Sequence, residues 1–282
     1  MIADEVDFIT PHITDAHTLD YPCFHTGFVC EYELPRWAPI HIGRFALDIS
    51  PTRHVVMLWI AATLCIVTTL IALRAHNRRT REGKAPSGFG NGLEALVLYL
   101  RNEVVLPNVG AHGNGYVPYL LTLFFFILFA NLLGLVPYGA TATGNISVTA
   151  TLAIVTFIVI ELAGMKAQGK AYINTIIFWP SDMSLGMKLF ISPILTPIEL
   201  IGKITKPFAL AIRLFANMVS GHVVLLALLS LIFTFGSWFL VPVPLLMATG
   251  IVILELFVAF LQAFIFTLLS SVFIGLIREG AH

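Results

Sequence analysis

The sequence predicts an all-α integral membrane protein, with about five membrane-crossing helices and one amphipathic helix on the membrane surface. Of its 282 residues, 57% are hydrophobic and only 11% are charged, and the mean hydropathy is +0.88. Soluble globular domains carry about 25% charged residues, so the composition argues against an ordinary water-soluble enzyme. The formal net charge is zero, which gives no reason to expect a nucleic-acid partner.

The first part of the chain, residues 1–53, is expected to be a retained segment outside the membrane, ahead of a membrane domain at 54–282. Its start lacks the basic and then apolar stretch of a signal peptide, and its prolines and scattered polar residues suggest loops. Cys23 and Cys30 could form a disulfide in an oxidising compartment, although their spacing does not decide this. Its acidic residues are Asp4, Glu5, Asp7, Asp15, Asp20, Glu31, Glu33 and Asp48.

Five apolar segments are long enough to cross a membrane, which requires about 20 residues of helix. We expect the crossings at about residues 55–73, 119–136, 146–162, 189–235 and 243–277. The last two exceed the length of a perpendicular crossing, so they are expected to form a long, strongly tilted hairpin, to lie partly in the interface, or to break at a proline. The candidate break points are Pro193, Pro197 and Pro207.

The basic residues indicate the orientation, because cytoplasmic loops are enriched in Lys and Arg. A basic cluster follows the first span directly: Arg74, Arg78, Arg79, Arg81 and Lys84. We therefore expect this loop and the C-terminus in the cytoplasm, and the N-terminus on the outer side. Residues 92–105 have apolar side chains at helical spacing, but they are too few and too charged to span, so they predict an amphipathic surface helix.

Several polar residues lie inside the last two spans, where a charged side chain costs about 2.5–3.5 kcal/mol at mid-membrane. They are Glu199, Lys203, Lys206, Arg213, Asn217 and His222 on the first of these spans, and Glu255 and Gln262 on the second. Such residues are candidates for an ion pathway rather than for packing.

Helix geometry groups these residues into stripes. At about 100° per residue, Arg213 shares one face with small side chains, which allow another helix to approach closely. This stripe contains Lys206, Ala209, Arg213, Ala216, Asn217 and Ser220, and Glu199 lies within about 40° of it. If the two spans form an antiparallel hairpin, Arg213 lies at the depth of Gln262, and His222 lies at the depth of Glu255. The two layers are about 13.5 Å apart along the axis.

The chemistry of the two layers differs. Arg213 is permanently charged, since guanidinium pKa values exceed about 12; it can hold a carboxylate ionised and repel protons. His222 and Glu255 can exchange protons near neutral pH when their surroundings shift them. The pattern suits a proton path interrupted by a gate, and it lacks a mobile carboxylate partner, which must come from another chain.

Three stretches resemble subunit a of the rotary F-type ATP synthases. They are KPFALAIRLFANMVSGH at 206–222, LELFVAFLQAFIF at 254–266 and ANLLGLVP at 130–137. Many bacterial members of that family carry Glu where this chain has His222 and His where it has Glu255. The order found here is similar to that of mitochondrial and alphaproteobacterial members.

The resemblance implies a role for each residue. Arg213 would be the essential stator arginine facing the carboxylate of the c-subunit ring, with Ala209, Ala216 and Ser220 facing the same ring. Asn217, His222, Glu255 and Gln262 would line the outer half-channel, and Glu199 would lie near the inner one. The chain would translocate protons as part of the complex, with no catalytic chemistry, cofactor or metal of its own.

The resemblance also implies partners and a location. The partners are the c ring, b-type peripheral stalk subunits and membrane lipid. The expected location is the bacterial inner membrane, with the mitochondrial inner membrane as the alternative.

Other interpretations remain open on the residues alone. The chain could be a proton-coupled secondary transporter or a membrane anchor subunit of another complex, although it has no internal repeat of the kind that transporters often carry. His222 with Glu255 could be a static hydrogen-bonded pair, and Glu199 with Lys203 a solvated pair. Glu161 is expected to be an interface anchor beside Lys166, and Asn131 to serve either helix packing or the channel.

Overall fold

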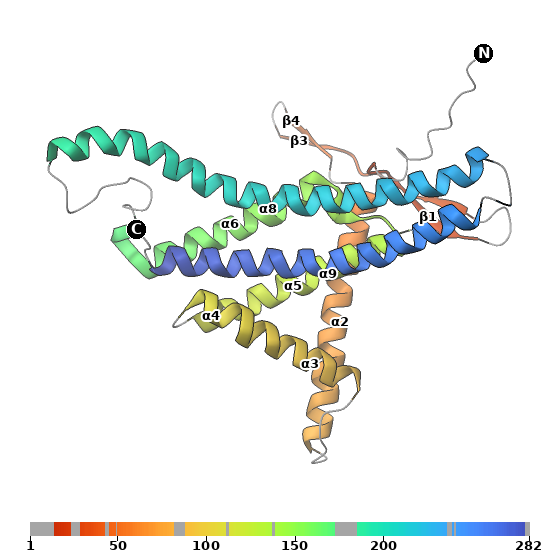
Figure 1. Cartoon of the computed structure of the whole chain (residues 1–282), viewed down its shortest axis with the longest axis horizontal. Helices are drawn as coiled ribbons and strands as arrows, with labels where there is room; N and C mark the ends of the chain where they lie inside the picture. Colours follow the sequence, from red (N-terminus) through yellow and green to blue (C-terminus); the bar gives the residue numbers. More distant parts are fainter. Residues whose placement is uncertain are drawn as a thin grey trace. The chain divides into compact units, whose positions relative to one another are not determined.

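The computed structural model describes residues 14–23, 29–42, 45–48, 50–81, 88–110, 113–136, 139–172, 185–235, 239 and 241–279. The chain divides into two compact units. Figure 1 labels the helices and strands. The first contains Met1–Ile71, Phe125–Val148 and Leu214–Ala263. The second contains Ala72–Phe124, Thr149–Arg213 and Phe264–His282. Lys84 and Pro137, which contributed to the predicted orientation and to the family motif, lie outside the described residues.

Five helices of the described chain are long and apolar enough to cross a membrane. They are α2 (Arg53–Arg81), α5 (Val117–Leu135), α6 (Ile146–Gln168), α8 (Leu185–Phe235) and α9 (Pro242–Glu279). Four of the five predicted apolar segments each lie within one of these helices, and the segment 119–136 extends one residue beyond the end of α5. This confirms the all-α membrane class, because only a helix satisfies its own backbone hydrogen bonds in lipid.

The prolines of α8 do not divide it. Pro193, Pro197 and Pro207 all lie inside one helix of 51 residues, so a break at a proline, one of the three possibilities for this long segment, does not occur. Proline is tolerated in membrane helices where neighbouring groups satisfy the backbone that it leaves unpaired.

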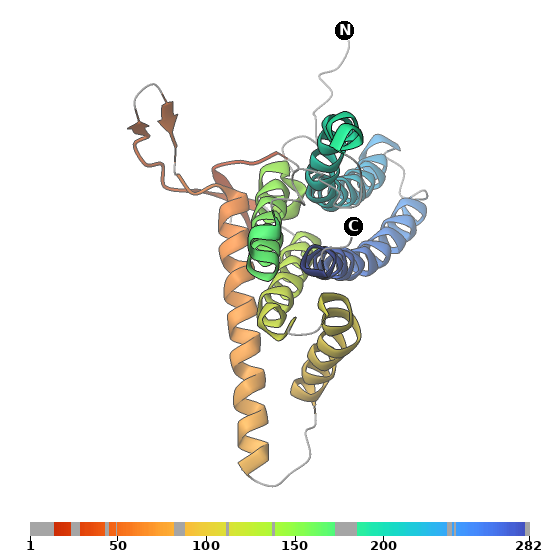
Figure 2. The same ribbon diagram turned by 90° about the vertical axis from the view of Figure 1, so that its left-hand side faces the viewer.

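The predicted amphipathic segment is helical and extends further than expected in both directions. It consists of α3 (Phe89–Tyr99), the π-helical turn η1 (Leu100–Val105) and α4 (Leu106–Val109), which follow one another directly (Figure 2). Leu100 and Val104 are buried, whereas Asn102 and Glu103 are exposed. The helix ends at Gly110, whose φ of 79° favours glycine.

The N-terminal segment contains β-structure in place of the loops that its sequence suggested. Strands β1 (Thr18–Pro22) and β2 (Val29–Glu33) pair antiparallel, and so do β3 (Ile40–Ile42) and β4 (Phe45–Leu47). In β2, the residues from Cys30 to Glu33 alternate between apolar and acidic side chains, which is typical of a strand with two different faces.

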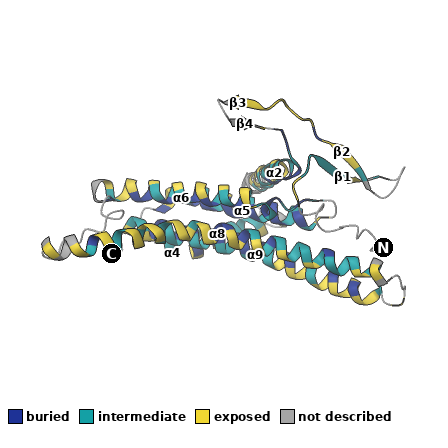
Figure 3. Ribbon diagram, turned by 90° about the horizontal axis from the view of Figure 1, so that it is seen from above, coloured by how far each residue is buried: buried dark blue, intermediate teal, exposed yellow. Residues whose placement is uncertain are grey.

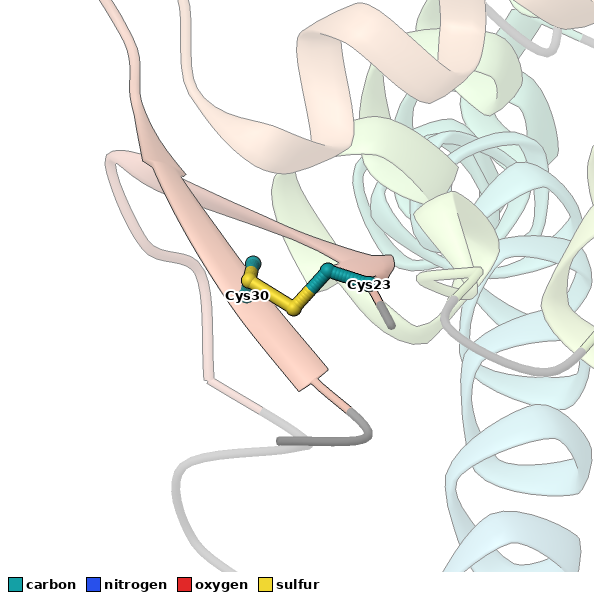
Figure 4. The surroundings of a disulfide bond; sticks show 2 residues. All are labelled: Cys23 and Cys30. Atoms are coloured by element: carbon teal, nitrogen blue, oxygen red, sulfur yellow. A yellow bond between two sulfur atoms is a disulfide. The ribbon is translucent and has the colours of Figure 1, made fainter. Parts of the chain in front are cut away.

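A disulfide closes the first hairpin. Cys23 directly follows β1, and Cys30 lies in β2 opposite Tyr21. Their Cα atoms are 5.7 Å apart and their sulfur atoms are bonded (Figure 4). The pairing that the spacing left open is therefore present, because the antiparallel register brings the two cysteines together.

Hydrogen bonds at Ser50 connect the end of this segment to its middle. The Ser50 hydroxyl accepts from the Trp37 backbone N–H at 2.9 Å, and the Ser50 N–H donates to Asp48 Oδ1 at 2.9 Å. The Ser50 side chain and its backbone N–H together lower the pKa of Asp48, because both donate to the ionised carboxylate.

Each unit has its own core. In the second unit, side chains of η1, α4, α5, α6 and α9 pack together: Val105, Val109, Val117, Leu120, Ile160, Ala163 and Ile274. Gly275 brings α9 against the backbone of this cluster, since a Cβ there would overlap the Asn108 carbonyl oxygen. In the first unit, Met57 of α2 packs with Ala140 and Ala142, and Leu19 of β1 covers this cluster. The N-terminal segment is thus packed against α2.

Candidate functional site

A buried polar stripe runs along α9. Glu255, Ala259 and Gln262 are spaced i, i+4 and i+7 and therefore share one helix face. All three are buried, with exposed fractions of 6%, 0% and 4%. Glu255 Oε2 has no hydrogen-bond partner within the described residues. A carboxylate held in this way is costly in an apolar surrounding, which favours a functional role over a packing role.

The Glu255 side chain packs against α8 at Gly221. A Cβ on Gly221 would overlap Glu255 Oε1 and would lie 3.0 Å from its Cγ and Cδ. Glycine is required here because the carboxyl group occupies the space of a side chain. Gly221 directly precedes His222, which is partly buried. The structure therefore brings Glu255 to the turn of α8 that carries His222, at the depth that the hairpin geometry predicted.

Asn131 of α5 contacts the same face of α9. Its Nδ2 donates to the Ala259 carbonyl oxygen at 3.3 Å, and its Oδ1 accepts from Thr143 Oγ1 at 2.6 Å. Both side chains are fully buried. Ala259 lies between Glu255 and Gln262 on the stripe, so the Asn131 amide reaches the centre of the polar face. Whether Asn131 serves helix packing or the channel, it acts at this one place on α9.

Sequence reasoning missed Thr143. It lies in the short turn η3 (Ala142–Gly144) between α5 and α6. A threonine among small residues in a loop carries no signal of its own, and only the fold brings it to Asn131.

The Arg213 stripe of α8 is exposed. Arg213, Ala209, Ala216 and Ser220 are all exposed, and Lys206 is exposed as well, while Asn217 is partly buried. A neighbouring face of the same turns is buried, at Leu210, Leu214 and Met218. Figure 3 shows buried and exposed residues along the helices. Within the described residues Arg213 forms no ion pair, although it lies in an apolar helix.

The predicted residues are divided between the two units. Asn217, His222, Glu255 and Gln262 belong to the first unit, whereas Glu199 and Arg213 belong to the second. The partly buried Glu199 lies near the start of α8.

Lys203, one turn after Glu199, lies 3.8 Å from the Glu161 carboxylate and has its Nζ 5.0 Å from the centre of the Tyr172 ring. Glu161 therefore faces α8, with the ammonium group of Lys203 as its charged neighbour. Its role as an interface anchor stays a prediction.

Groups of His, Cys, Asp or Glu that could hold a metal ion do not occur among the described residues. The polar groups that the structure brings together here are carboxyl, amide and hydroxyl groups. These can bind and pass protons or orient water, as ionisable residues inside membrane proteins commonly do.

Fold and site together define a multi-pass membrane protein with ionisable residues inside its long helices. The sequence profile of the family described as "ATP synthase A chain" matches residues 55–275. The chain belongs to this family.

Individual relatives agree with this. The chain is 46% identical to ATP synthase subunit a of Chloroherpeton thalassium over 265 residues, which cover 94% of this chain and 74% of the relative. It is 47% identical to ATP synthase subunit a 2 of Prosthecochloris aestuarii over 96% of this chain and 78% of the relative. It is 42% identical to ATP synthase subunit a of Myxococcus xanthus over 96% of this chain and 89% of the relative.

Proposed function

We propose that this chain is the proton-conducting stator subunit of an F-type ATP synthase. It provides two offset half-channels and an arginine gate, which couple proton movement to rotation of a c ring and so to ATP synthesis. Its family and its relatives, which carry the name ATP synthase subunit a, support this assignment. Their bacterial sources and the five apolar helices support a multi-pass protein of the bacterial inner membrane.

The observation that carries the proposal is the exposure of Arg213. An arginine in an apolar helix normally pairs with an acid or faces water. Here it is exposed between Ala209 and Ala216 and has no ion pair within the described residues. Small neighbours leave room for a helix of another chain, so the acid that pairs with Arg213 is supplied by the c ring.

The proton path uses the buried stripe. A proton enters from the outer side by way of Glu255 and His222, with Gln262 and Asn217 lining the route. It neutralises a ring carboxylate that has just left Arg213, and it then travels with the ring through lipid. It leaves on the Glu199 side, when the next approach to Arg213 favours the ionised carboxylate.

Arg213 also separates the two half-channels. Its fixed positive charge repels protons, and a guanidinium group does not release its proton under physiological conditions, so it cannot pass one. A proton that crosses a 100 mV potential releases about 2.3 kcal/mol. Without the gate this energy would be lost as a leak.

The proposed orientation, with the N-terminus on the outer side and the C-terminus in the cytoplasm, is supported by the basic residues at the end of α2, because cytoplasmic segments are enriched in Lys and Arg. The partners are the c ring on the Arg213 stripe and b-type peripheral stalk subunits. The exposed apolar side chains of α8, such as Ile201 and Phe208 at 60% and 62% exposure, suit lipid or a neighbouring subunit.

The test is replacement of Arg213 by Ala in the assembled complex. We expect ATP synthesis and ATP-driven proton pumping to stop, with an increased passive proton leak in vesicles. Arg74→Ala is the matched control, because Arg74 is exposed at the end of the first span. Normal ATP-driven pumping by the Arg213→Ala complex would refute the stator role.

A cross-link tests which face meets the ring. A cysteine at Ala216, which is exposed, should form a disulfide with a cysteine placed in the c subunit near its carboxylate. A cysteine at Ala259, which is fully buried, should not. Equal yields at the two positions, or no product at Ala216 in an intact complex, would contradict the proposed interface.

A further inference from the structure

His54, in the first turn of α2, lies between the N-terminal segment and the start of α6. It is buried, with 4% exposure. Its Nδ1 is 3.3 Å from Asp15 Oδ1 and 3.2 Å from Asn145 Nδ2. All three residues belong to the first unit, as do Asn131 and Glu255. A single ring nitrogen thus has two polar neighbours from two different parts of the chain.

The N-terminal segment is attached to the same turn of α2 by further bonds. The His54 backbone N–H donates to Asp15 Oδ1 at 3.2 Å, and the Arg53 backbone N–H donates to the Ala16 carbonyl at 2.8 Å. The buried Arg53 side chain pairs with Asp20 at 2.9 Å. Asp15 is therefore held beside His54 from both the backbone and the side chain.

On its other side, His54 contacts a turn that reaches the polar stripe. The Asn145 amide touches His54, and its Oδ1 accepts from the Ser147 backbone N–H at 2.9 Å at the start of α6. Two residues earlier, Thr143 donates to Asn131, which in turn donates to the Ala259 carbonyl. Residues 139–145 thus connect His54 to the centre of the α9 stripe.

This turn is packed too tightly to move without moving Thr143. A Cβ on Gly134 of α5 would overlap Thr141 Oγ1 and would lie 2.8 Å from the Thr141 Cβ. Ala140 and Ala142 are buried against Met57 of α2. Close-packed interiors transmit displacements, so a change at Asn145 reaches Thr143 and Asn131.

We infer that Asp15 and His54 are positioning residues of the outer half-channel. They hold Asn145, and through the turn at 139–145 they keep Asn131 on α9 between Glu255 and Gln262. This gives the N-terminal segment a role in proton conduction. The inference rests on the proposed function, since it assumes that Glu255 lies in the proton path.

The hydrogen bond between His54 and Asn145 depends on the protonation state of His54. When Nδ1 carries a lone pair, it accepts from Asn145 Nδ2; when it carries a proton, it donates to Asp15 and Asn145 loses its acceptor. The charged groups that act on the ring are Asp15 and Arg53, and Arg53 is itself paired with Asp20. The contact from the α6 side, Asn145, is uncharged. Protonation from the outer side therefore releases the turn.

The experiment measures passive proton conductance of the complete membrane sector in proteoliposomes, at a constant pH difference across the membrane. His54→Leu should lower the conductance about fivefold at neutral pH, a factor typical of one lost hydrogen bond. His54→Gln should keep most of it, because its amide oxygen can accept from Asn145. His41→Leu is the control, since His41 is exposed in β3.

The dependence of the conductance on outer pH distinguishes a positioning role of His54 from a role in folding alone. The wild-type conductance should fall as the outer pH drops far enough to protonate His54, and His54→Gln should not show this fall. Asp15→Asn should move the fall to lower pH, because the carboxylate that stabilises the protonated ring is gone. These two variants keep the hydrogen-bonding groups and decide the matter even if His54→Leu does not assemble.

Equal conductance of His54→Leu and His41→Leu would overturn the inference. So would a pH profile that is the same in the wild type, His54→Gln and Asp15→Asn. Glu255→Gln in the same assay distinguishes failure of the positioning role from failure of the proposed function. If it abolishes conductance while the His54 variants change nothing, only the positioning role fails. If it changes nothing, the proposed function itself fails.

Discussion

The two polar stripes of α8 and α9 differ in what covers them. On α9, Glu255, Ala259 and Gln262 are buried at 6%, 0% and 4% exposure, and the Asn131 amide of α5 reaches the stripe from inside the same chain. On α8, Arg213 and its small neighbours Ala209 and Ala216 are exposed. Both stripes combine an ionisable residue with small side chains, and they differ in whether this chain alone provides their neighbours.

This difference in burial indicates that the same sequence pattern, a charged residue among small ones, serves two roles. Small residues beside a charge allow close approach of another helix. On α9 the neighbouring helices are α5, at Ala259, and α8, at Glu255, and the stripe is covered inside the subunit. On α8 the stripe remains open, which suits a contact that forms and breaks as ring subunits pass. The predictions below separate the two roles.

The largest effect is expected for Glu255→Gln. In the proposed function the Glu255 carboxyl group carries the proton, and loss of a proton-transfer group typically lowers a rate by about 100-fold or more. Passive proton flux through the membrane sector measures this. Glu161→Gln is the matched control inside a span, since Glu161 faces Lys203 in the second unit. Comparable losses in the two variants would remove the distinction between the stripe and other membrane carboxylates.

Leucine in place of the alanine on each stripe tests the comparison directly. Ala259→Leu should overpack a fully buried site and destabilise the subunit by about 1–3 kcal/mol. Ala216→Leu, at an exposed site, should change subunit stability by less than about 0.5 kcal/mol and should still impair ATP-driven pumping, because it obstructs the ring. Thermal unfolding of the purified subunit and pumping by the assembled complex give the two measurements. Similar stability losses would contradict the assignment of the stripes.

Gly221→Ala tests the contact between α8 and Glu255. The new Cβ would overlap the Glu255 carboxyl group, so a cost of about 1–3 kcal/mol is expected for displaced side chains, together with reduced proton flux. Gly250→Ala on α9 is the control, because a Cβ there has no neighbour within 4 Å. If both variants conduct and unfold like the wild type, Glu255 does not pack against Gly221 in the complex.

The smallest effect is expected for Thr143→Val. It removes the hydroxyl that donates to Asn131 Oδ1 at 2.6 Å and keeps the shape of the side chain. Hydrogen bonds between membrane helices contribute about 0.6 kcal/mol on average and at most about 1.7, so a loss near 1 kcal/mol is expected. Thr122→Val is the control, since the exposed Thr122 hydroxyl bonds only within its own helix, to the Pro118 carbonyl. Equal unfolding temperatures of the two variants would show that the buried hydrogen bond of Thr143 contributes no more to stability than the exposed one of Thr122.

The sequence predicted the long helices well and the N-terminal segment poorly. A bilayer-spanning helix must be apolar over its whole length, so the apolar runs locate α2, α5, α6, α8 and α9 to within a few residues at most ends. Strands β3 and β4 have three residues each, too few for alternation to stand out from a loop. Their pairing depends on register, which the hydrophobic pattern of such short segments specifies only weakly.

The sequence predicted the part of the candidate site that lies within the hairpin of α8 and α9. Counting along two antiparallel helices places Glu255 beside the turn of His222, and the structure brings Glu255 to Gly221. Counting could not bring Asn131 to Ala259, or Glu161 to Lys203, because these contacts join helices that are distant in sequence. These contacts depend on how α5 and α6 are rotated about their axes. The surfaces of the two helices are almost uniformly apolar, so the sequence does not indicate that rotation.

Length, composition and charge placement in the sequence were sufficient for the membrane class, the number of long helices and the ionisable residues among them, because lipid imposes the same demands on every spanning segment. Tertiary packing was needed to establish which polar stripe is closed and which is open, and to bring Asp15, His54 and Asn145 together. The reason is physical: burial of a side chain depends on which helix lies against it, and that depends on contacts between residues far apart along the chain.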